Sequence, residues 1–115
     1  MVELRPEEKV WGEALHVFGN DACAVSVLTV KKGFRCSDHF HMDRINRFVV
    51  KSGKIVVVIG DPPEQITLSA GQMVDVEPRK THRFEVLEDG VVIEVYFPKP
   101  VRFDDIVRFN SGGRA

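Results

Sequence analysis

Short apolar segments with a two-residue period dominate this sequence and constrain its fold more than any other feature. In these segments apolar residues alternate with polar ones or form brief β-branched runs, which is the pattern of buried or half-buried β-strands. They fall at residues 15–18, 23–30, 48–50, 55–59, 65–68, 73–76, 84–87 and 91–97. No stretch keeps a 3.6-residue period long enough to predict a major helix. The sequence therefore predicts an all-β protein.

Clusters of turn-forming residues separate the predicted strands. They are rich in the Gly, Asn, Asp and Pro that favour tight reversals of the chain. They occupy residues 19–21, 32–33, 52–54, 60–63, 70–71 and 89–90. Short strands joined by tight turns are typical of antiparallel sheets closed into a small barrel or jelly roll. We expect that arrangement here.

The length of 115 residues fits one domain spanning residues 1–115, since domains commonly run to about 100–200 residues. Hydrophobic residues make up 43% of the chain and charged residues 29%, which is enough apolar material for a packed core. Lys and Arg number 16 against 17 Asp and Glu, a formal net charge of −1. Balanced charge gives no general attraction for a polyanion, so we expect no nucleic-acid partner.

The longest apolar run, residues 55–60, is far shorter than the roughly 20 residues that cross a bilayer. Residues 1–10 carry too many charges for a secretory signal peptide. We therefore expect a cytoplasmic protein without a membrane partner. The two cysteines, Cys23 and Cys36, favour neither a disulfide framework nor a cysteine-based zinc site.

Three of the four histidines stand where predicted strands begin or turn. His39 and His41 are two residues apart, and residues at that spacing share one face of an extended segment. His82 shares a face with Phe84 and Val86 by the same count. Neutral imidazoles are the commonest metal ligands, and three that converge in a barrel mouth can hold a divalent ion with coordination positions left open. The alternative is a set of hydrogen-bonded surface histidines.

The spacing around the first histidine pair resembles the first cupin motif. Gly33 is followed after five residues by His39 and His41, after four more by Asn46, and after six more by Gly53. The cupin pattern has Gly, five residues, HxH, three or four residues, Glu, six residues and Gly, so Asn46 stands where the family has Glu. The resemblance implies a double-stranded β-helix, the cupin jelly-roll barrel, with a bound divalent metal.

The second cupin motif is matched more loosely, over residues 71–86. Its pattern is Gly, five to seven residues, PxGxxH, then three residues and Asn. Gly71 and His82 occupy their positions in the pattern. Its Pro, Gly and Asn positions are taken by Glu77, Arg79 and Val86. The resemblance implies that His82 joins His39 and His41 as the third metal ligand.

Three further segments resemble the cupin domain of type II mannose-6-phosphate isomerases. Residues 9–12, Lys-Val-Trp-Gly, resemble that family's R-P-W-G, and Arg44 stands where its H-H-H-R-A-E has Arg. The letters I-E-V at 93–95 and, eight residues later, D-D-I-V-R-F at 104–109 resemble the same letters in the family. The family's Gln at the first ligand position is His39 here.

This resemblance implies an aldose–ketose isomerase that acts on an anionic sugar or another small anionic molecule. Such an enzyme needs a metal to polarise the sugar oxygens and a group that moves a proton between neighbouring carbons. Zinc is the expected ion, with manganese, iron and nickel as alternatives. Glu94 is the candidate proton-transfer residue. Both faces of the predicted strand at 91–97 are largely apolar, so the sequence does not decide whether the Glu94 side chain points into the barrel or outward. Arg44 is the candidate contact for the substrate anion, and Asn46 a weak fourth ligand or a residue just behind the ligands.

Two other functions remain open from the residues alone. Three neutral imidazoles and an amide leave a divalent ion at its full charge, which is the ligand chemistry of three-histidine iron dioxygenases among the cupins. A barrel of this kind can also bind a sugar or other metabolite without chemistry. Zinc with little dependence on oxygen favours the isomerase, whereas iron with oxygen uptake favours the dioxygenase.

The two ends of the chain give the remaining expectations. Residues 104–109, with apolar positions spaced for one turn, predict a short C-terminal helical segment. Trp11 can plug the base of its own barrel, or it can pack with the apolar strand at 15–18 against a second copy of the chain. Edge strands need cover, and two-fold pairs are the commonest oligomers. We therefore expect a homodimer.

Overall fold

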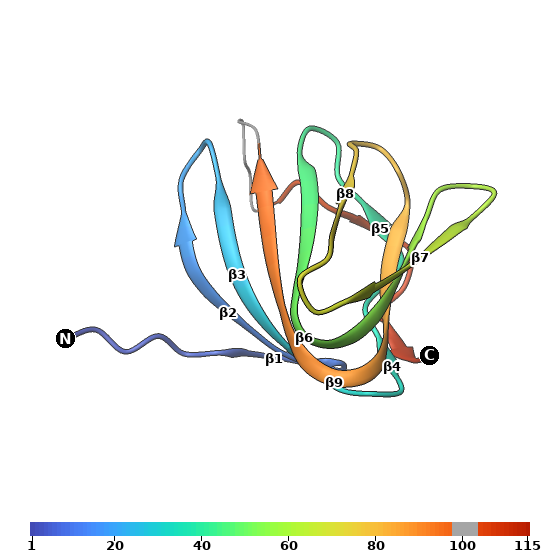
Figure 1. The fold of residues 1–115 in the computed structure, drawn as a ribbon. Helices are drawn as coiled ribbons and strands as arrows, with labels where there is room; N and C mark the ends of the chain where they lie inside the picture. The colour runs from blue at the N-terminus through green and yellow to red at the C-terminus, as the bar shows by residue number, and fades with distance from the viewer. Residues whose placement is uncertain (98–103) are drawn as a thin grey trace.

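A computed structural model of the chain describes residues 1–97 and 104–115. These residues form one curled, antiparallel sheet (Figure 1). Its strands are β1 (Glu7–Lys9), β2 (Gly12–Gly19), β3 (Ala24–Val30), β4 (Phe34–Arg35), β5 (His39–Phe40), β6 (Ile45–Ile59), β7 (Glu64–Ser69), β8 (Met73–Val76), β9 (His82–Phe97), β10 (Val107–Arg108) and β11 (Gly113–Arg114). The all-β expectation is confirmed. None of the described residues forms a helix with the length and apolar character that crossing a membrane requires.

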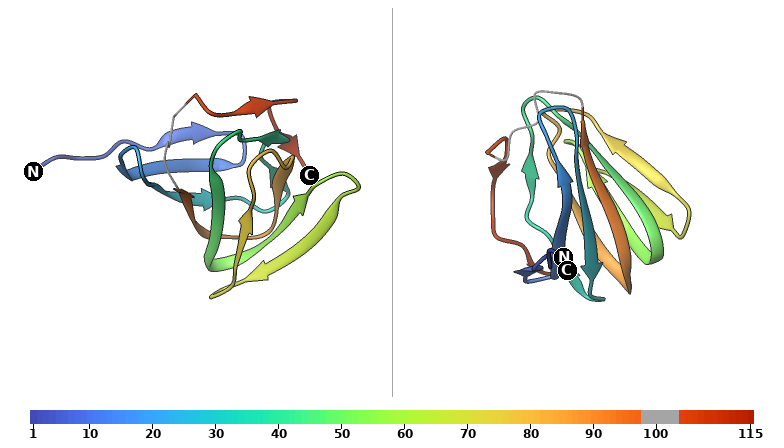
Figure 2. Two further views of the ribbon diagram at one scale, coloured as in Figure 1. Left: turned by 90° about the horizontal axis from the view of Figure 1, so that it is seen from above. Right: turned by 90° about the vertical axis from the view of Figure 1, so that its left-hand side faces the viewer.

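Two long strands, β6 and β9, form the centre of the sheet, and most of the other strands pair with one of them. They run antiparallel along their whole length, with Ile45 opposite Phe97 and Ile59 opposite His82. One half of β9 continues the sheet through β3 and β2 to β1, and its other half borders β4 and β5. The first half of β6 borders β8 and its second half borders β7. Both strands bend midway, so the two halves of the sheet curl around a shared interior (Figure 2).

Glycines make the shared bend of β6 and β9 possible. Gly53 has a φ of +81°, and a Cβ built there would lie 2.5 Å from a carbonyl oxygen of β9. A Cβ at Gly90 would lie 2.0 Å from a carbonyl oxygen of β6. The turns predicted at 52–54 and 89–90 are therefore wrong as chain reversals. Their residues form a paired irregularity inside continuous strands, because glycine serves a bulge as readily as a turn.

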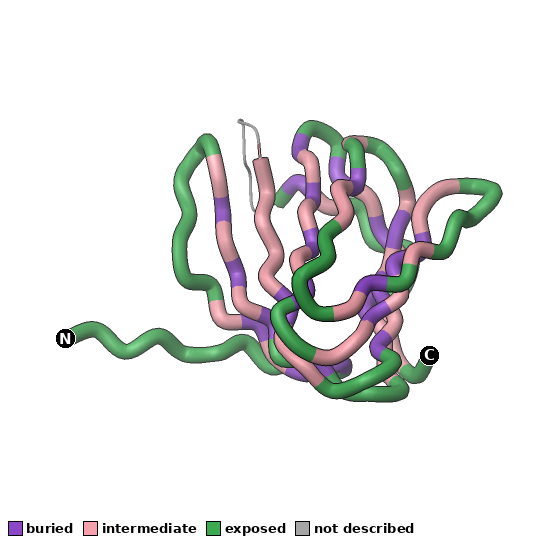
Figure 3. The backbone as a smooth tube through the Cα atoms, viewed as in Figure 1, coloured by how far each residue is buried: buried purple, intermediate pink, exposed green. Residues whose placement is uncertain are grey.

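The apolar core lies on the inner side of this bend, and along β3, β6 and β9 most buried positions alternate with partly buried ones (Figure 3). It consists of Trp11, Ala14, Leu28, Val30, Cys36, Phe48, Val50, Ile55, Val57, Leu68, Val76, Phe84, Val86 and Val92. The ring centroids of Trp11 and Phe84 are 5.1 Å apart in an edge-to-face contact. Trp11 therefore packs into the base of its own barrel, which is one of the two expectations for this residue.

The C-terminal segment is extended, so the helix expected at 104–109 is wrong. Strand β10 pairs with β5, with Val107 opposite Phe40 and Arg108 opposite His39, and β11 pairs with β4. The short edge strands β4 and β5 offer unpaired backbone groups that the segment satisfies. The β-branched pair Ile106 and Val107 suits an extended backbone better than a helical turn.

Candidate metal centre

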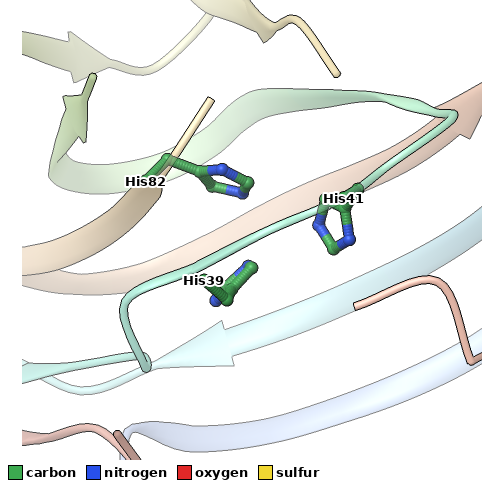
Figure 4. Close-up of side chains that lie close together, drawn as sticks. All are labelled: His39, His41 and His82. Carbon is green, nitrogen blue, oxygen red and sulfur yellow. The ribbon is translucent and has the colours of Figure 1, made fainter. Parts of the chain in front are cut away.

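His39, His41 and His82 meet in the interior of the sheet, each buried (Figure 4). His39 begins β5 and stands opposite His82, which begins β9. His41 follows two residues after His39, so strand alternation turns both imidazoles to the same side. One ligand nitrogen of each ring lies within 4.8 Å of the others. The predicted convergence of the three histidines is confirmed.

Backbone carbonyls fix the orientation of all three imidazole rings. The distances from Nδ1 to the accepting oxygen are 2.8 Å for His39 to Ser37, 2.7 Å for His41 to Asp105, and 3.0 Å for His82 to Lys80. A carbonyl oxygen only accepts, so each Nδ1 carries the hydrogen and each Nε2 keeps a lone pair. Metal-binding histidines in proteins are held in this way.

Two observations show that a cation fits the cluster. Nε2 of His41 is buried and has no hydrogen-bond partner in the described structure. His82 faces an acceptor at both ring nitrogens, since the side-chain oxygen of Asn46 lies 3.2 Å from its Nε2. A neutral imidazole has one N–H and cannot satisfy both acceptors. A divalent ion held by the Nε2 atoms would give His41 its missing partner, and with the Asn46 oxygen as a further ligand it would also remove the mismatch at His82. Three imidazoles suit zinc, manganese, iron or nickel.

Burial keeps the three histidines neutral. It is the main cause that lowers the pKa of His39 to about 3 and the pKa of His41 and of His82 to about 4. Positive charge nearby adds to this: the other two rings when protonated lower the pKa of His39, and the guanidinium of Arg44 lowers the pKa of His41 and of His82. The nitrogen lone pairs are therefore free for a metal at neutral pH.

Asn46, on β6, lies between the histidine cluster and Glu94. Its side-chain oxygen points to His82, and its side-chain nitrogen donates to a carboxylate oxygen of Glu94 at 3.4 Å. Asn46 is completely buried. This position is compatible with both predicted roles, a weak fourth ligand or a residue just behind the ligands, and the choice between them stays a prediction.

A cavity of about 620 Å³ opens beside the cluster, and His39, Arg44, Glu94 and Tyr96 are among its lining residues. The sequence left the direction of Glu94 open, and the structure turns it inward. Burial raises the pKa of Glu94, while hydrogen bonds from Tyr96 and Asn46 act against this. Burial also raises the pKa of the Tyr96 hydroxyl well above its usual range. The guanidinium carbon of Arg44 lies 3.6 Å from the centre of the Tyr96 ring.

Two other basic residues near the motifs, Arg47 and Arg83, are not among the lining residues of the cavity. Arg47 forms a two-point ion pair with Asp75, at 2.7 and 2.9 Å. Arg83 pairs with Asp38 and Glu85. Their guanidinium groups are engaged in ion pairs on the outer face of the sheet.

Arg79 links two ligand-bearing segments through its backbone. Its N–H donates to the carbonyl oxygen of His41, and its φ of +66° lies in the left-handed region. This is the position where the second cupin motif has Gly, the residue that adopts such a φ without strain. The structure thus gives a physical reason for the Gly in that pattern.

The sequence did not indicate the role of Asp105. Its buried carboxylate accepts from the backbone N–H groups of Met42 and Asp43, at 2.6 and 3.0 Å, while its carbonyl oxygen holds His41. Arg108 on β10 also lines the cavity; it lies within the D-D-I-V-R-F segment, to which the sequence assigned no role at the site. Both positions follow from the pairing of β10 with β5, which local sequence patterns do not reveal.

Comparison with protein-family models gives one match, to the cupin domain, over residues 26–97. This covers more than half of the chain and includes all three histidines. The chain belongs to the cupin family. A search of curated proteins gave no match.

Solved structures with the same fold include larger cupin-like proteins. The capsular polysaccharide assembling protein CapF from Staphylococcus aureus superposes with a TM-score of 0.79 at 24% identity, over 94% of this cupin and 33% of that chain. Oxalate decarboxylase from Bacillus subtilis at pH 4.6 gives 0.80 at 16% identity, over 93% and 30%. A further structure of that enzyme, described with Mn(II) centres, gives 0.78 at 13% identity, over 93% of this cupin and 30% of that chain. This cupin therefore spans about a third of the length of these chains, and identities this low show a shared fold.

Proposed function

We propose that this metal-binding cupin is an enzyme of the isomerase type, which moves a proton between neighbouring carbons of an anionic sugar such as a sugar phosphate. The observation that carries the proposal is one cavity lined by a cluster histidine, a partly buried carboxyl group and a buried guanidinium, those of His39, Glu94 and Arg44. A reaction of this type needs a metal-binding residue, a proton-transfer group and a cation for the substrate anion. A bound divalent ion would supply polarisation of the sugar oxygens.

Glu94 is the proton-transfer residue in this proposal. Its raised pKa brings the carboxyl group closer to neutral pH, where it can both accept and return a proton. Asn46 donates to one of its oxygens at 3.4 Å and fixes the orientation of the carboxyl plane. Tyr96 also hydrogen-bonds it, so the group is held in place before substrate arrives.

Arg44 is the substrate-anion contact in this proposal, with Arg108 at the same cavity as a second cation. Arg44 is held against the Tyr96 ring, which limits its rotamers and presents its N–H groups in a fixed plane. The resemblance of the sequence to type II mannose-6-phosphate isomerases supports a sugar phosphate. The fold shared with the capsular polysaccharide assembling protein CapF is compatible with a sugar as substrate class.

The test is turnover of mannose 6-phosphate to fructose 6-phosphate by protein loaded with zinc or, separately, manganese. Glu94→Gln should lower kcat at least about a hundredfold without changing metal content. Glu85→Gln is the matched control, since Glu85 lies on the same strand but pairs outward with Arg83. Loaded wild-type protein that leaves this sugar phosphate unchanged would overturn the isomerase proposal.

One feature favours a second candidate, a three-histidine iron dioxygenase. The cluster offers three neutral imidazoles, and Asn46 stands where the cupin pattern has a carboxylate. Oxygen uptake by iron-loaded protein on a diketone or thiol substrate would support this candidate, and metal analysis of the purified protein gives the first indication. Tight sugar binding without turnover or oxygen uptake would indicate a non-catalytic binding protein.

A further inference from the structure

A second group of chemically competent side chains lies outside the histidine cluster, on the three strands at the other edge of the sheet. Ser26 on β3 stands opposite His16 on β2, and its hydroxyl oxygen lies 2.7 Å from Nδ1 of His16. Nε2 of His16 lies 3.0 Å from a carboxylate oxygen of Glu7 on β1. Lys9 contacts the other oxygen of that carboxylate at 2.8 Å.

The direction of these hydrogen bonds follows from the charge of Glu7. Hydrogen bonds from His16 and Lys9 lower the pKa of Glu7 to about 2, so this group is a carboxylate and only accepts. Nε2 of a neutral His16 must then carry the hydrogen, which leaves the lone pair on Nδ1. Ser26 consequently donates its hydroxyl hydrogen to His16. Histidine in this state can remove the proton of a serine and make it a nucleophile.

Ser26 also has room for a substrate. It is buried, with 4% of its surface exposed, and it lines the cavity of about 620 Å³. Trp11, Leu28 and Phe84 give the same cavity an apolar wall, which suits a short apolar acyl chain. Lys9, Arg44 and Arg108 line it as well and are the cations that can face negative charge developing on a carbonyl oxygen.

We propose that Ser26 is an activated nucleophile that accepts the acyl group of small esters, with His16 as the general base. Ser26 Oγ bonds to the ester carbonyl carbon while its proton moves to Nδ1 of His16. The bond from that carbon to the alcohol oxygen breaks, and the alcohol leaves with the proton. Water then attacks the acyl-serine through the same histidine, which releases the acid and restores Ser26. Glu7 is a positioning residue that fixes the tautomer of His16.

The first experiment is covalent labelling of the full chain with a fluorophosphonate probe, followed by peptide mass spectrometry. An adduct on Ser26 is expected, with fluoride displaced. Protein dialysed against EDTA before the probe is added should be labelled to the same extent, because no cluster histidine takes part. Ser26→Ala should abolish the adduct. Ser111→Ala is the matched control, since Ser111 lines the same cavity on the C-terminal segment. Absence of a Ser26 adduct at millimolar probe would overturn the proposal.

The second experiment is hydrolysis of p-nitrophenyl acetate, which separates the roles of His16 and Glu7. His16→Gln should lower kcat at least about a hundredfold. Glu7→Gln should lower kcat roughly tenfold with KM unchanged, because the carboxylate acts through the histidine. Glu8→Gln, an exposed neighbour on the same strand, is the control. Rates that are equal in wild type and His16→Gln would refute the assignment, and zinc uptake that is unchanged in each variant shows that the fold is intact.

Discussion

The side chain of Asn46 contacts His82 of the histidine cluster on one side and the carboxyl group of Glu94 on the other. A negative charge at this position should help a metal ion to bind but should repel Glu94. The Asn46 oxygen lies 3.2 Å from Nε2 of His82 and its nitrogen 3.4 Å from a Glu94 carboxylate oxygen, so Asn46→Glu adds a negative charge close to both groups. A divalent ion should bind more tightly, by roughly tenfold, because a carboxylate is the stronger donor. Without metal, two close carboxyl groups should lower the thermal midpoint. Competition with a chelator and thermal unfolding measure the two effects.

Asn46→Gln is the neutral control for that experiment, because it lengthens the side chain without adding charge. Its metal affinity should not rise. Affinity that is unchanged or weaker in Asn46→Glu would place Asn46 outside the coordination sphere, as a residue that orients Glu94 alone.

The sequence predicts the metal residues better than the residues that support them, for a physical reason. His39 and His41 share a face because of local strand alternation. The resemblance to the second cupin motif predicts His82 as the third member of the cluster. Asp105 holds the His41 ring from 64 residues further along the chain. That contact depends on the pairing of β10 with β5, which is decided by the whole sheet.

At the scale of elements, the bend shared by β6 and β9 allows a matched pair of substitutions. Gly53 and Gly33 have similar φ values, +81° and +88°, but a Cβ at Gly53 meets a carbonyl oxygen at 2.5 Å whereas a Cβ at Gly33 meets nothing within 4 Å. Gly33→Ala should cost about 1 kcal/mol of unfolding free energy, the backbone strain alone. Gly53→Ala should cost at least about 2 kcal/mol more. Urea denaturation measures the difference, and equal losses would contradict the close approach.

At the same bend, the local sequence pattern does not decide whether a glycine ends a strand in a turn or bends a continuous strand. Gly53 and Gly90 carry turn chemistry, and the two strands on either side of each were predicted as separate. The structure joins them because β6 and β9 bend at the same point and stay paired through it. Whether a glycine reverses or bends a strand is determined by the partner strand, 37 residues away in this case.

For the whole molecule, the lowered pKa values of the cluster histidines predict how stability depends on pH. Between about pH 6.5 and pH 4 the unfolded chain binds protons at these histidines that the folded, metal-free protein excludes. Stability should therefore fall as pH falls through this range, by up to about 1.4 kcal/mol per pH unit and histidine. The raised pKa of Glu94 acts in the opposite direction, because the folded protein binds that proton more readily than the unfolded chain. Since three histidines oppose this one carboxyl group, the net effect is a loss of stability at lower pH.

Chemical denaturation of EDTA-treated protein at pH 7.5 and pH 5 tests this dependence. A His82→Gln variant removes one of the three groups and should flatten the slope. Metal-free protein that is as stable at pH 5 as at pH 7.5 would show that the histidines take up protons without unfolding.

The assembly of the molecule provides a further prediction, a homodimer. Trp11 lies in its own core, so the exposed apolar residues Val17 and Phe18 of β2, 41% and 50% exposed, are the candidates for contact with a second copy. Light scattering should give twice the 13.0 kDa of one chain. Phe18→Asp should lower this mass, whereas Phe109→Asp, at a comparably exposed phenylalanine (60%), should not. A mass near one chain for the wild type would refute the dimer.

The hydrogen bond from His41 to the carbonyl of Asp105 has a consequence for the order of events during synthesis. A ribosome makes His39, His41 and His82 well before residue 105, and until then the His41 ring lacks the acceptor that turns its Nε2 inward. Metal loading should therefore follow translation of the C-terminal segment instead of guiding the folding of the first strands. Stalled nascent chains that have exposed residue 82 but not residue 105 should gain no protease resistance from zinc, and chains extended past residue 108 should gain it.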